Sequence, residues 1–170
     1  IGITKTGSTI SRCTVHGANE GGTVTPCSVT STGLNAGGLI GDHQNGTLEQ
    51  CTTECNVAGK ENVGGLMGLH GTSGGDTTDC KASGNISGEK TVGGFVGVSS
   101  NGNFTRCSAQ GYFPDEVATA IGCTVSGQQN VGGFAGALTG GDVRGSYAAV
   151  DVSNGTYDHS SNVGGFVGLI

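Results

Sequence analysis

The chain has 170 residues and a formal net charge of −6, and 36 of its residues are glycine, whereas aromatic residues make up 5% and tryptophan is absent. This inventory is poor in the large apolar side chains of a conventional globular core, but it suits thin strands that bury a few apolar residues in each layer. No lysine or arginine run provides the basic track that nucleic acid binding needs, and no apolar run approaches the roughly 18 residues of a membrane span. We therefore expect neither a nucleic acid partner nor a membrane span.

Five copies of a glycine-rich segment, called here the glycine box, divide the chain. Their first glycines are 27, 29, 39 and 32 residues apart, a period typical of a solenoid, in which each unit buries its apolar face only when a neighbour stacks on it. The sequence therefore predicts one all-β domain over residues 1–170. We expect a single-stranded, right-handed β-solenoid (β-helix) of about five coils, with three short strands in each coil. The glycine boxes are Asn35–Gly41, Asn62–Gly68, Thr91–Gly97, Asn130–Gly136 and Asn162–Gly168.

Two further segments recur in each unit, an apolar-x-x-Cys segment and a Cys-x-apolar segment, and together they cover all seven cysteines. The spacing between the recurring segments varies because some units carry extra residues. A solenoid tolerates such inserts at its corners, where the strand pairing above and below is not disturbed. We expect corner loops at residues 16–26, 110–122 and 154–161, and partner contacts at Tyr112 and Phe113 in the second loop.

Stacking equivalent residues of successive coils about 4.8 Å apart predicts columns of like side chains. Asparagine amides in such a column can bond to the coil above and below, as in an asparagine ladder. Each glycine box contributes two adjacent apolar columns, and the sequence leaves open whether the glycines bend the chain there or one column is covered from outside. The expected core columns are Leu39, Leu66, Phe95, Phe134 and Phe166, and Val29, Val57, Ile86, Val125 and Val152; the expected ladder is Asn35, Asn62, Asn130 and Asn162.

The G-G-[LF]-x-G boxes, with the C-x-[TA] and x-V-x-G segments between them, resemble GLUG-motif repeats. Such repeats occur in bacterial surface adhesins and in the non-catalytic region of secreted IgA-specific zinc metalloproteases. The resemblance covers essentially the whole chain and implies a β-solenoid. It brings no catalytic residue with it.

The cysteines allow two interpretations. Pairing within each coil predicts the disulfides Cys13–Cys27, Cys51–Cys55 and Cys107–Cys123 and leaves Cys80 as a free thiol, which would place the protein in an oxidising, extracellular compartment. Alternatively, the cysteines are small apolar residues stacked in a reduced column. Four N-x-S/T sequons are possible N-glycosylation sites at corners or outward positions, namely Asn45, Asn85, Asn103 and Asn154.

Few residues suggest chemistry. The histidines His16, His43, His70 and His159 lie in polar corner regions and are expected to be solvated; no zinc-site spacing and no nucleophile elbow occurs. Stacking could bring carboxylates to one face, as in β-helical lyases and glycosidases, although such residues are more often solvated. These carboxylates are Asp76, Asp79, Asp142 and Asp151. We expect no cofactor and no metal.

The sequence thus favours a non-enzymatic structural or adhesive domain, extracellular or on the cell surface, that serves as a rigid stalk or filament subunit. Ile1–Gly2 has the same phase as Val167–Gly168, so we expect a fragment of a longer repeat protein or a unit that stacks head to tail. The expected partners are other copies or neighbouring repeats, or a host or matrix protein or glycan. The alternatives are a spacer or substrate-binding region of a secreted protease or carbohydrate-active enzyme, and a carbohydrate-binding or ice-binding β-helix.

Overall fold

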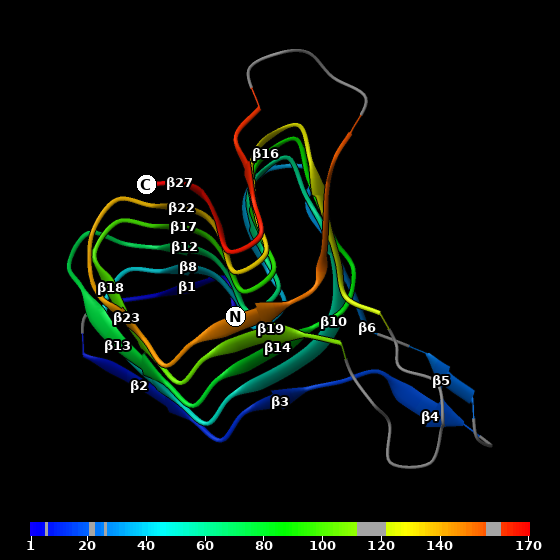
Figure 1. Ribbon diagram of the computed structural model, residues 1–170. Helices are drawn as coiled ribbons and strands as arrows, with labels where there is room; N and C mark the ends of the chain where they lie inside the picture. Colours follow the sequence, from blue (N-terminus) through cyan, green and yellow to red (C-terminus); the bar gives the residue numbers. More distant parts are fainter. Residues whose placement is uncertain (6, 21–22, 26, 112–121, 156–160) are drawn as a thin grey trace.

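The computed structural model of the chain describes residues 1–5, 7–20, 23–25, 27–111, 122–155 and 161–170, and this part of the chain consists of β-strands and their connections, without a helix. Within it, no helix is long and apolar enough to cross a membrane. Successive coils lie on one another, so the strands form parallel sheets of the kind found in a β-solenoid (Figure 1). The predicted all-β stacked architecture is therefore confirmed.

Each coil passes through four parallel sheets. The first sheet has the order β1 (Ile3–Thr4), β8 (Ile40–His43), β12 (Met67–His70), β17 (Val96–Ser99), β22 (Ala135–Leu138) and β27 (Val167–Leu169). The second has the order β2 (Ser8–Ser11), β9 (Gly46–Glu49), β13 (Gly75–Thr78), β18 (Gly102–Thr105) and β23 (Val143–Arg144).

The third sheet is the largest, because its central strand β10 (Thr52–Ala58) pairs with shorter strands along both halves. Its order is β24 (Tyr147–Ala149), β19 (Ser108–Gln110), β14 (Lys81–Ser83), β10, β15 (Ile86–Ser87), β20 (Thr124–Gly127) and β25 (Asp151–Asn154), and β3 (Thr14–Val15) and β6 (Cys27–Thr30) also pair with β10. The fourth sheet has the order β26 (Val163–Gly164), β21 (Gln129–Gly132), β16 (Lys90–Gly93), β11 (Glu61–Gly64) and β7 (Leu34–Gly37).

The predicted core columns are confirmed by the register. Val57 lies opposite both Val29 and Ile86 on the neighbouring strands, and the Phe95, Phe134 and Phe166 rings are stacked. The ring centroids are 4.8 Å apart for Phe95 and Phe134 and 4.9 Å apart for Phe134 and Phe166, with the ring planes within 8° of parallel. One apolar residue at the same position of each coil therefore forms a column that continues through the stack.

The expectation of three strands per coil is wrong, because the glycine box forms two strands rather than one and because the third-sheet segment is also divided in most coils, as in β14 and β15. In the second box, β11 ends at Gly64 and β12 begins at Met67, and the chain bends sharply between them. The bend explains how the two adjacent apolar columns of the box are both accommodated. Leu66 and Met67 are both fully buried.

The second glycine of each box lies at a waist that divides the interior into two cores. Gly94 shows this arrangement most clearly. A Cβ atom at Gly94 would overlap the carbonyl oxygen of Gly133 and would lie 2.9 Å from Ala109 Cβ and 3.2 Å from Val125 Cγ2. Ala109 belongs to the larger core, which contains the phenylalanines, and Val125 to the smaller, valine-rich core. The box therefore needs glycine here because the opposite walls of the coil meet at this point.

The predicted asparagine ladder is confirmed for two pairs. Asn62 Nδ2 donates to Asn35 Oδ1 over 2.7 Å, and Asn162 Nδ2 donates to Asn130 Oδ1 over 2.8 Å. Asn35, Asn62 and Asn130 have φ between 48° and 60°, in the left-handed region that asparagine tolerates better than most residues. Thr91 interrupts the ladder and adopts the same conformation, with φ of 53°.

Thr91→Asn is expected to raise the free energy of unfolding by about 1 kcal/mol, because a β-branched residue is strained at positive φ and asparagine relieves part of that strain. Denaturant titration of the variant and the parent measures the change. Thr105→Asn, in strand β18, serves as the control and is expected to be neutral or slightly destabilising because asparagine is a poor strand residue. Equal changes in both variants would contradict the argument from φ.

The first predicted insert contains a β-hairpin. Strands β4 (Ala18–Glu20) and β5 (Thr23–Thr25) pair in antiparallel fashion and leave the stack between β3 and β6 (Figure 1). The hairpin does not disturb the coil, since β3 and β6 both remain paired with β10. Large parts of the other two inserts, including Tyr112 and Phe113, lie outside the described residues.

Candidate functional site

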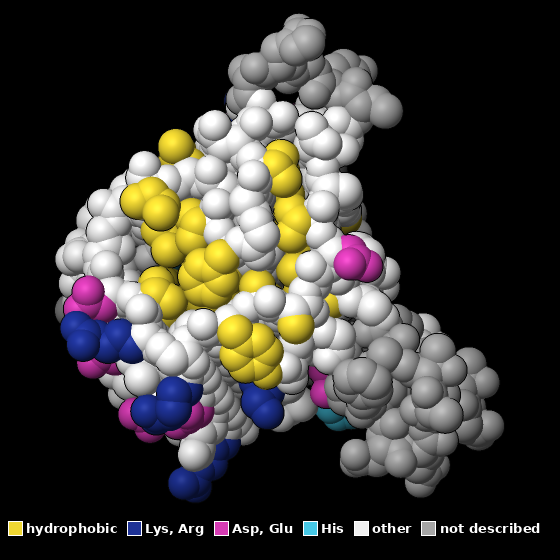
Figure 2. Space-filling model, viewed as in Figure 1, with side chains coloured by type: hydrophobic (Ala, Val, Ile, Leu, Met, Phe, Trp, Pro, Cys, Tyr) yellow, Lys and Arg dark blue, Asp and Glu magenta, His cyan; other side chains and the backbone are white. Residues whose placement is uncertain are grey.

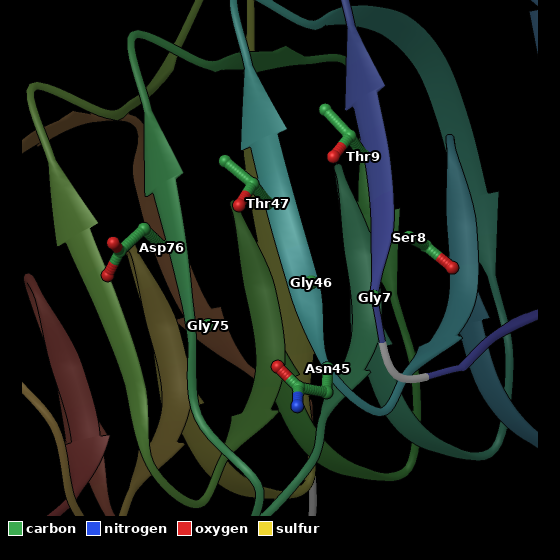
Figure 3. A pocket seen from close by; sticks show the side chains of 8 residues that line it. All are labelled: Gly7, Ser8, Thr9, Asn45, Gly46, Thr47, Gly75 and Asp76. Atoms are coloured by element: carbon green, nitrogen blue, oxygen red, sulfur yellow. The ribbon is translucent and has the colours of Figure 1, made fainter.

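The outward face of the second sheet carries a row of polar side chains above a shallow groove. Thr9, Thr47 and Asp76 follow one another across β2, β9 and β13, and Asn45 directly precedes β9 (Figure 3). The groove has a volume of about 520 Å³ and is completed by Gly7, Ser8, Gly46 and Gly75. Hydroxyl, amide and carboxylate groups on a flat, rigid sheet can exchange hydrogen bonds with a polar ligand.

The four carboxylates considered for catalysis do not share one face. Asp76 and Asp142 belong to the same outward row, with Asn103 between them; Asn103 Nδ2 donates to Asp76 Oδ1 over 3.0 Å, and its Oδ1 accepts from the Asp142 backbone nitrogen over 3.2 Å. Asp79 lies at a corner, and Asp151 lies on β25 in the third sheet. Of the four carboxylates, only Asp76 and Asp142 therefore lie in the same row.

Two of these carboxylates have an arginine partner. Arg106 binds Asp79 through two hydrogen bonds of 2.7 and 2.8 Å, which lower the pKa of this carboxyl, and Arg144 pairs with Asp142 at 2.8 Å. A general acid needs a raised pKa. Asp79 is therefore poorly suited to that role.

His43 and His70 are buried, and the prediction that they are solvated is wrong. Both are 0% exposed; their ring centroids are 5.0 Å apart, and His70 also contacts the Phe104 ring edge to face. His43 Nδ1 bonds to Thr4 Oγ1 over 2.6 Å, whereas His43 Nε2 and both ring nitrogens of His70 have no hydrogen-bond partner among the described residues. Burial, and to a smaller extent the neighbouring His43, lowers the pKa of His70 to about 4.

The other two histidines differ from this pair. His16 is exposed, as expected, and its Nδ1 lies 2.7 Å from the Gly17 carbonyl oxygen, whereas His159 is outside the described residues. In the described part of the chain, no group of three or more histidine, cysteine or acidic side chains is arranged to hold a metal ion.

The cysteine pairing predicted within each coil is wrong. Cys27 is bonded to Cys55 of the next coil, with a Cα–Cα distance of 4.5 Å, and Cys13, Cys51, Cys80, Cys107 and Cys123 are free thiols. The reason is the register: Cys27 and Cys55 face one another on the paired strands β6 and β10. Cys80 is free, as predicted.

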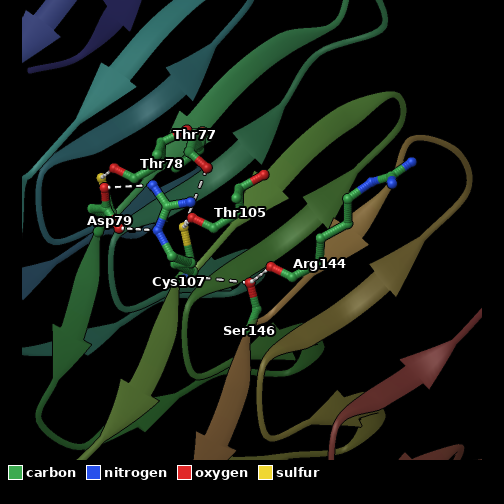
Figure 4. A network of polar contacts seen from close by, with 9 residues as sticks. Thr77, Thr78, Asp79, Thr105, Cys107, Arg144 and Ser146 are labelled. Atoms are coloured by element: carbon green, nitrogen blue, oxygen red, sulfur yellow. Dashed lines mark hydrogen bonds and ion pairs between the residues drawn. The ribbon is translucent and has the colours of Figure 1, made fainter.

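Four of the free cysteines form a column, called here the thiol ladder, at the corner between the second and third sheets. The ladder consists of Cys13, Cys51, Cys80 and Cys107. Cys51, Cys80 and Cys107 are fully buried, and the Cys51 backbone nitrogen donates to Cys80 Sγ over 3.4 Å. Ser146 continues the column, since its Oγ accepts from the Cys107 backbone nitrogen over 3.0 Å (Figure 4). The interpretation of the cysteines as a stacked, reduced column therefore describes these four residues.

The sequons differ in exposure. Asn85, Asn103 and Asn154 are exposed, as expected for outward positions, and Asn45 is half-buried at the groove. The side chains of Asn85 and Asn103 take part in bonds between coils; Asn85 Oδ1, for example, accepts from Thr124 Oγ1 over 2.8 Å. Glycosylation of the four asparagines stays a prediction.

In the comparisons with known proteins, no curated protein and no solved structure matches the chain. Residues 127–153 match the family described as the GLUG motif. This stretch includes the whole fourth glycine box and Ser146, which occupies the position of a ladder cysteine, and its strands β21 and β24 stack on β16 and β19 of the preceding coil. Because the same pattern recurs in the other coils, this match supports a resemblance of the chain to GLUG-motif repeat proteins.

Proposed function

We propose that the chain is a non-enzymatic structural region of an extracellular or cell-surface protein, in which a right-handed β-solenoid of about five coils acts as a rigid stalk or as a filament subunit. The observation that carries the proposal is the uninterrupted register of the phenylalanine column, from Phe95 through Phe134 to Phe166. Side chains stacked in this way resist bending because each coil is held by the next. The GLUG motif, which characterises non-catalytic repeat regions, supports the same function.

The location is supported by the Cys27–Cys55 disulfide, because such bonds persist in oxidising compartments and are rare in the cytosol. The bond joins two successive coils and therefore adds a covalent link along the stack. An adhesive role would use the corner inserts, which vary in length without disturbing the sheets.

The two end coils support end-to-end stacking with another copy or with a neighbouring repeat. Tyr147, Val163 and Leu169 are between 40% and 49% exposed on the C-terminal coil, where apolar side chains gather on the visible face (Figure 2). At the other end, Ile3 and Leu34 are 62% and 63% exposed. Both ends also present unpaired strand edges, which are templates for further pairing.

Stacking can be tested with a substitution that blocks only the C-terminal face. A Cβ at Gly165 meets nothing within 4 Å, whereas a Cβ at the equivalent Gly133 would overlap the Gly165 carbonyl oxygen of the next coil. We expect the parent chain to form end-to-end oligomers in sedimentation and electron microscopy as its concentration rises. Gly165→Val should stay folded and monomeric, and Thr78→Val, on the side of the stack, should assemble like the parent.

Two outcomes would count against this proposal. If the parent chain stays monomeric at high concentration, the filament function is excluded and the stalk function remains. Small-angle scattering tests the stalk, which requires a rigid, elongated particle. Turnover of a polysaccharide by the chain, lost in Asp142→Asn, would overturn the non-enzymatic function as a whole.

A second candidate function is glycan binding in the groove of the second sheet, which is favoured by the row of Thr9, Thr47 and Asp76. Titration calorimetry after a glycan array screen tests it, with Asp76→Ala expected to lose binding and Asp151→Ala, on another sheet, expected to retain it. A glycan attached to Asn45 would occupy the same groove, so binding should also require this asparagine to be unmodified. Binding that is equal in all variants would exclude the groove.

A further inference from the structure

Cys13 and Cys51 occupy equivalent positions on neighbouring coils at the N-terminal end of the thiol ladder. Each cysteine directly precedes a strand of the third sheet, β3 or β10, and these strands pair with Thr14 opposite Thr52. The Thr52 backbone nitrogen donates to the Cys13 carbonyl oxygen over 2.9 Å. One strand spacing, about 4.8 Å, therefore separates the two cysteines, within the Cα–Cα range of about 4.4–6.8 Å found in disulfides.

The same strand β10 already carries a bond of this kind. Cys55 on β10 is joined to Cys27 on β6, its in-register neighbour in the preceding coil. Cys13 and Cys27 both belong to the first coil, and Cys51 and Cys55 both belong to the second. The packing of these coils is thus compatible with a disulfide between parallel, in-register cysteines.

Each thiol of the ladder donates to the carbonyl oxygen two residues before it in its own coil, as Cys51 Sγ does to Glu49 over 3.3 Å. Cys51 Sγ lies 3.7 Å from the carbonyl oxygen of Ile10, in the coil of Cys13, and Cys107 Sγ lies 3.3 Å from that of Thr77, in the coil of Cys80. Cys80 Sγ also accepts from the Cys51 backbone nitrogen over 3.4 Å, so contacts between coils run along the whole column. Cys13 is half-buried, whereas the other three are fully buried, so a reagent in solution reaches the ladder at Cys13.

We propose that Cys13 and Cys51 are an oxidation site that forms a second disulfide between the first two coils in the presence of a small-molecule disulfide. The Cys13 thiolate attacks the reagent RSSR, which gives a Cys13–SR mixed disulfide and releases RSH after protonation. Cys51 then attacks the Cys13 sulfur and releases the second RSH. Two thiols are oxidised and one reagent disulfide is reduced to two thiols.

The new bond would hold both ends of the first insert. Cys13 precedes β3 and Cys27 begins β6, and the β4–β5 hairpin leaves the stack between these strands. With Cys13 joined to Cys51 and Cys27 joined to Cys55, both ends of the insert that carries the hairpin are attached to the second coil. The hairpin can then move without opening the edge of the stack.

The experiment incubates the purified chain with glutathione disulfide, alkylates the remaining thiols under denaturing conditions and maps the linked peptides by mass spectrometry. We expect the thiol count to fall from the five free cysteines to three, since two are consumed, and the new linked peptide to join Cys13 and Cys51. Amide exchange at Thr14 and Val15 should slow by about tenfold because local opening of the edge is restricted. A reductant should reverse this change.

Matched serine variants separate the possible pairings, and Ser146 shows that serine fits the column. Cys51→Ser should stop at a single glutathione adduct on Cys13, whereas Cys80→Ser should still form the Cys13–Cys51 bond. A Cys51–Cys80 peptide in the parent would overturn the proposed pairing. A stable Cys13 adduct in the parent, with Cys51 still alkylated, would overturn the proposal altogether.

Discussion

Gly94→Ala is expected to destabilise the protein by about 3 kcal/mol or more, the upper end of what one extra methyl costs in a packed interior. The methyl would overlap the Gly133 carbonyl oxygen and press on Ala109 and Val125 at the waist. Neither wall can yield easily, because Gly133 belongs to the backbone of the next coil and the two side chains belong to two different packed cores. Relief would require two coils to separate, with loss of their strand pairing.

Gly165→Ala is the matched control for this prediction. Gly165 is the second glycine of the last box, and a Cβ built there meets nothing within 4 Å. Denaturant titration of residues 1–170 should therefore show a change below about 0.5 kcal/mol, as for substitutions outside packed regions. Similar losses in the two variants would mean that backbone conformation, and not space at the waist, selects glycine at this position.

The repeat predicts the columns well because equivalent residues of successive coils lie one strand spacing apart. This reasoning gave the positions of Phe95, Phe134 and Phe166 and of the asparagine ladder. The same reasoning applied to the second cysteine segment pairs Cys27 with Cys55. The pairing within coils failed because it followed closeness in sequence, whereas the nearest neighbour in a solenoid is about one period away; Cys27 and Cys55 are 28 residues apart.

The buried histidines could also have been found from the sequence. His43 and His70 each lie two residues after the last glycine of a box, at Gly41 and Gly68. They therefore share a phase, and the register places them opposite one another on β8 and β12. The prediction treated both histidines as polar corner residues and therefore missed their shared position in the repeat. The bend inside the glycine box was harder to predict, because glycine pairs fit a strand and a corner equally well until the opposite wall is known.

Acidification is expected to destabilise the protein between about pH 6.5 and pH 4 through His70. Its pKa is near 6.5 in the unfolded chain and is lowered to about 4 in the folded protein, mainly by burial. The folded state therefore favours the neutral ring, so stability is complete above pH 6.5, falls as the unfolded chain takes up a proton, and levels off below about pH 4. The total loss is about 3 kcal/mol, at 1.36 kcal/mol for each pH unit of difference.

His70→Leu tests the origin of this loss, because leucine already occupies the same column at Leu138, beyond Ser99. The variant also removes two buried nitrogen atoms that have no partner among the described residues, and leaving such groups unpaired is costly. We therefore expect it to be at least as stable as the parent at pH 8 and to lose much less stability by pH 4. Burial also lowers the pKa of His43, so a smaller slope should persist. His16→Ala, which removes an exposed ring, should retain the full slope of the parent; an unchanged slope in His70→Leu would show that other groups cause the acid sensitivity.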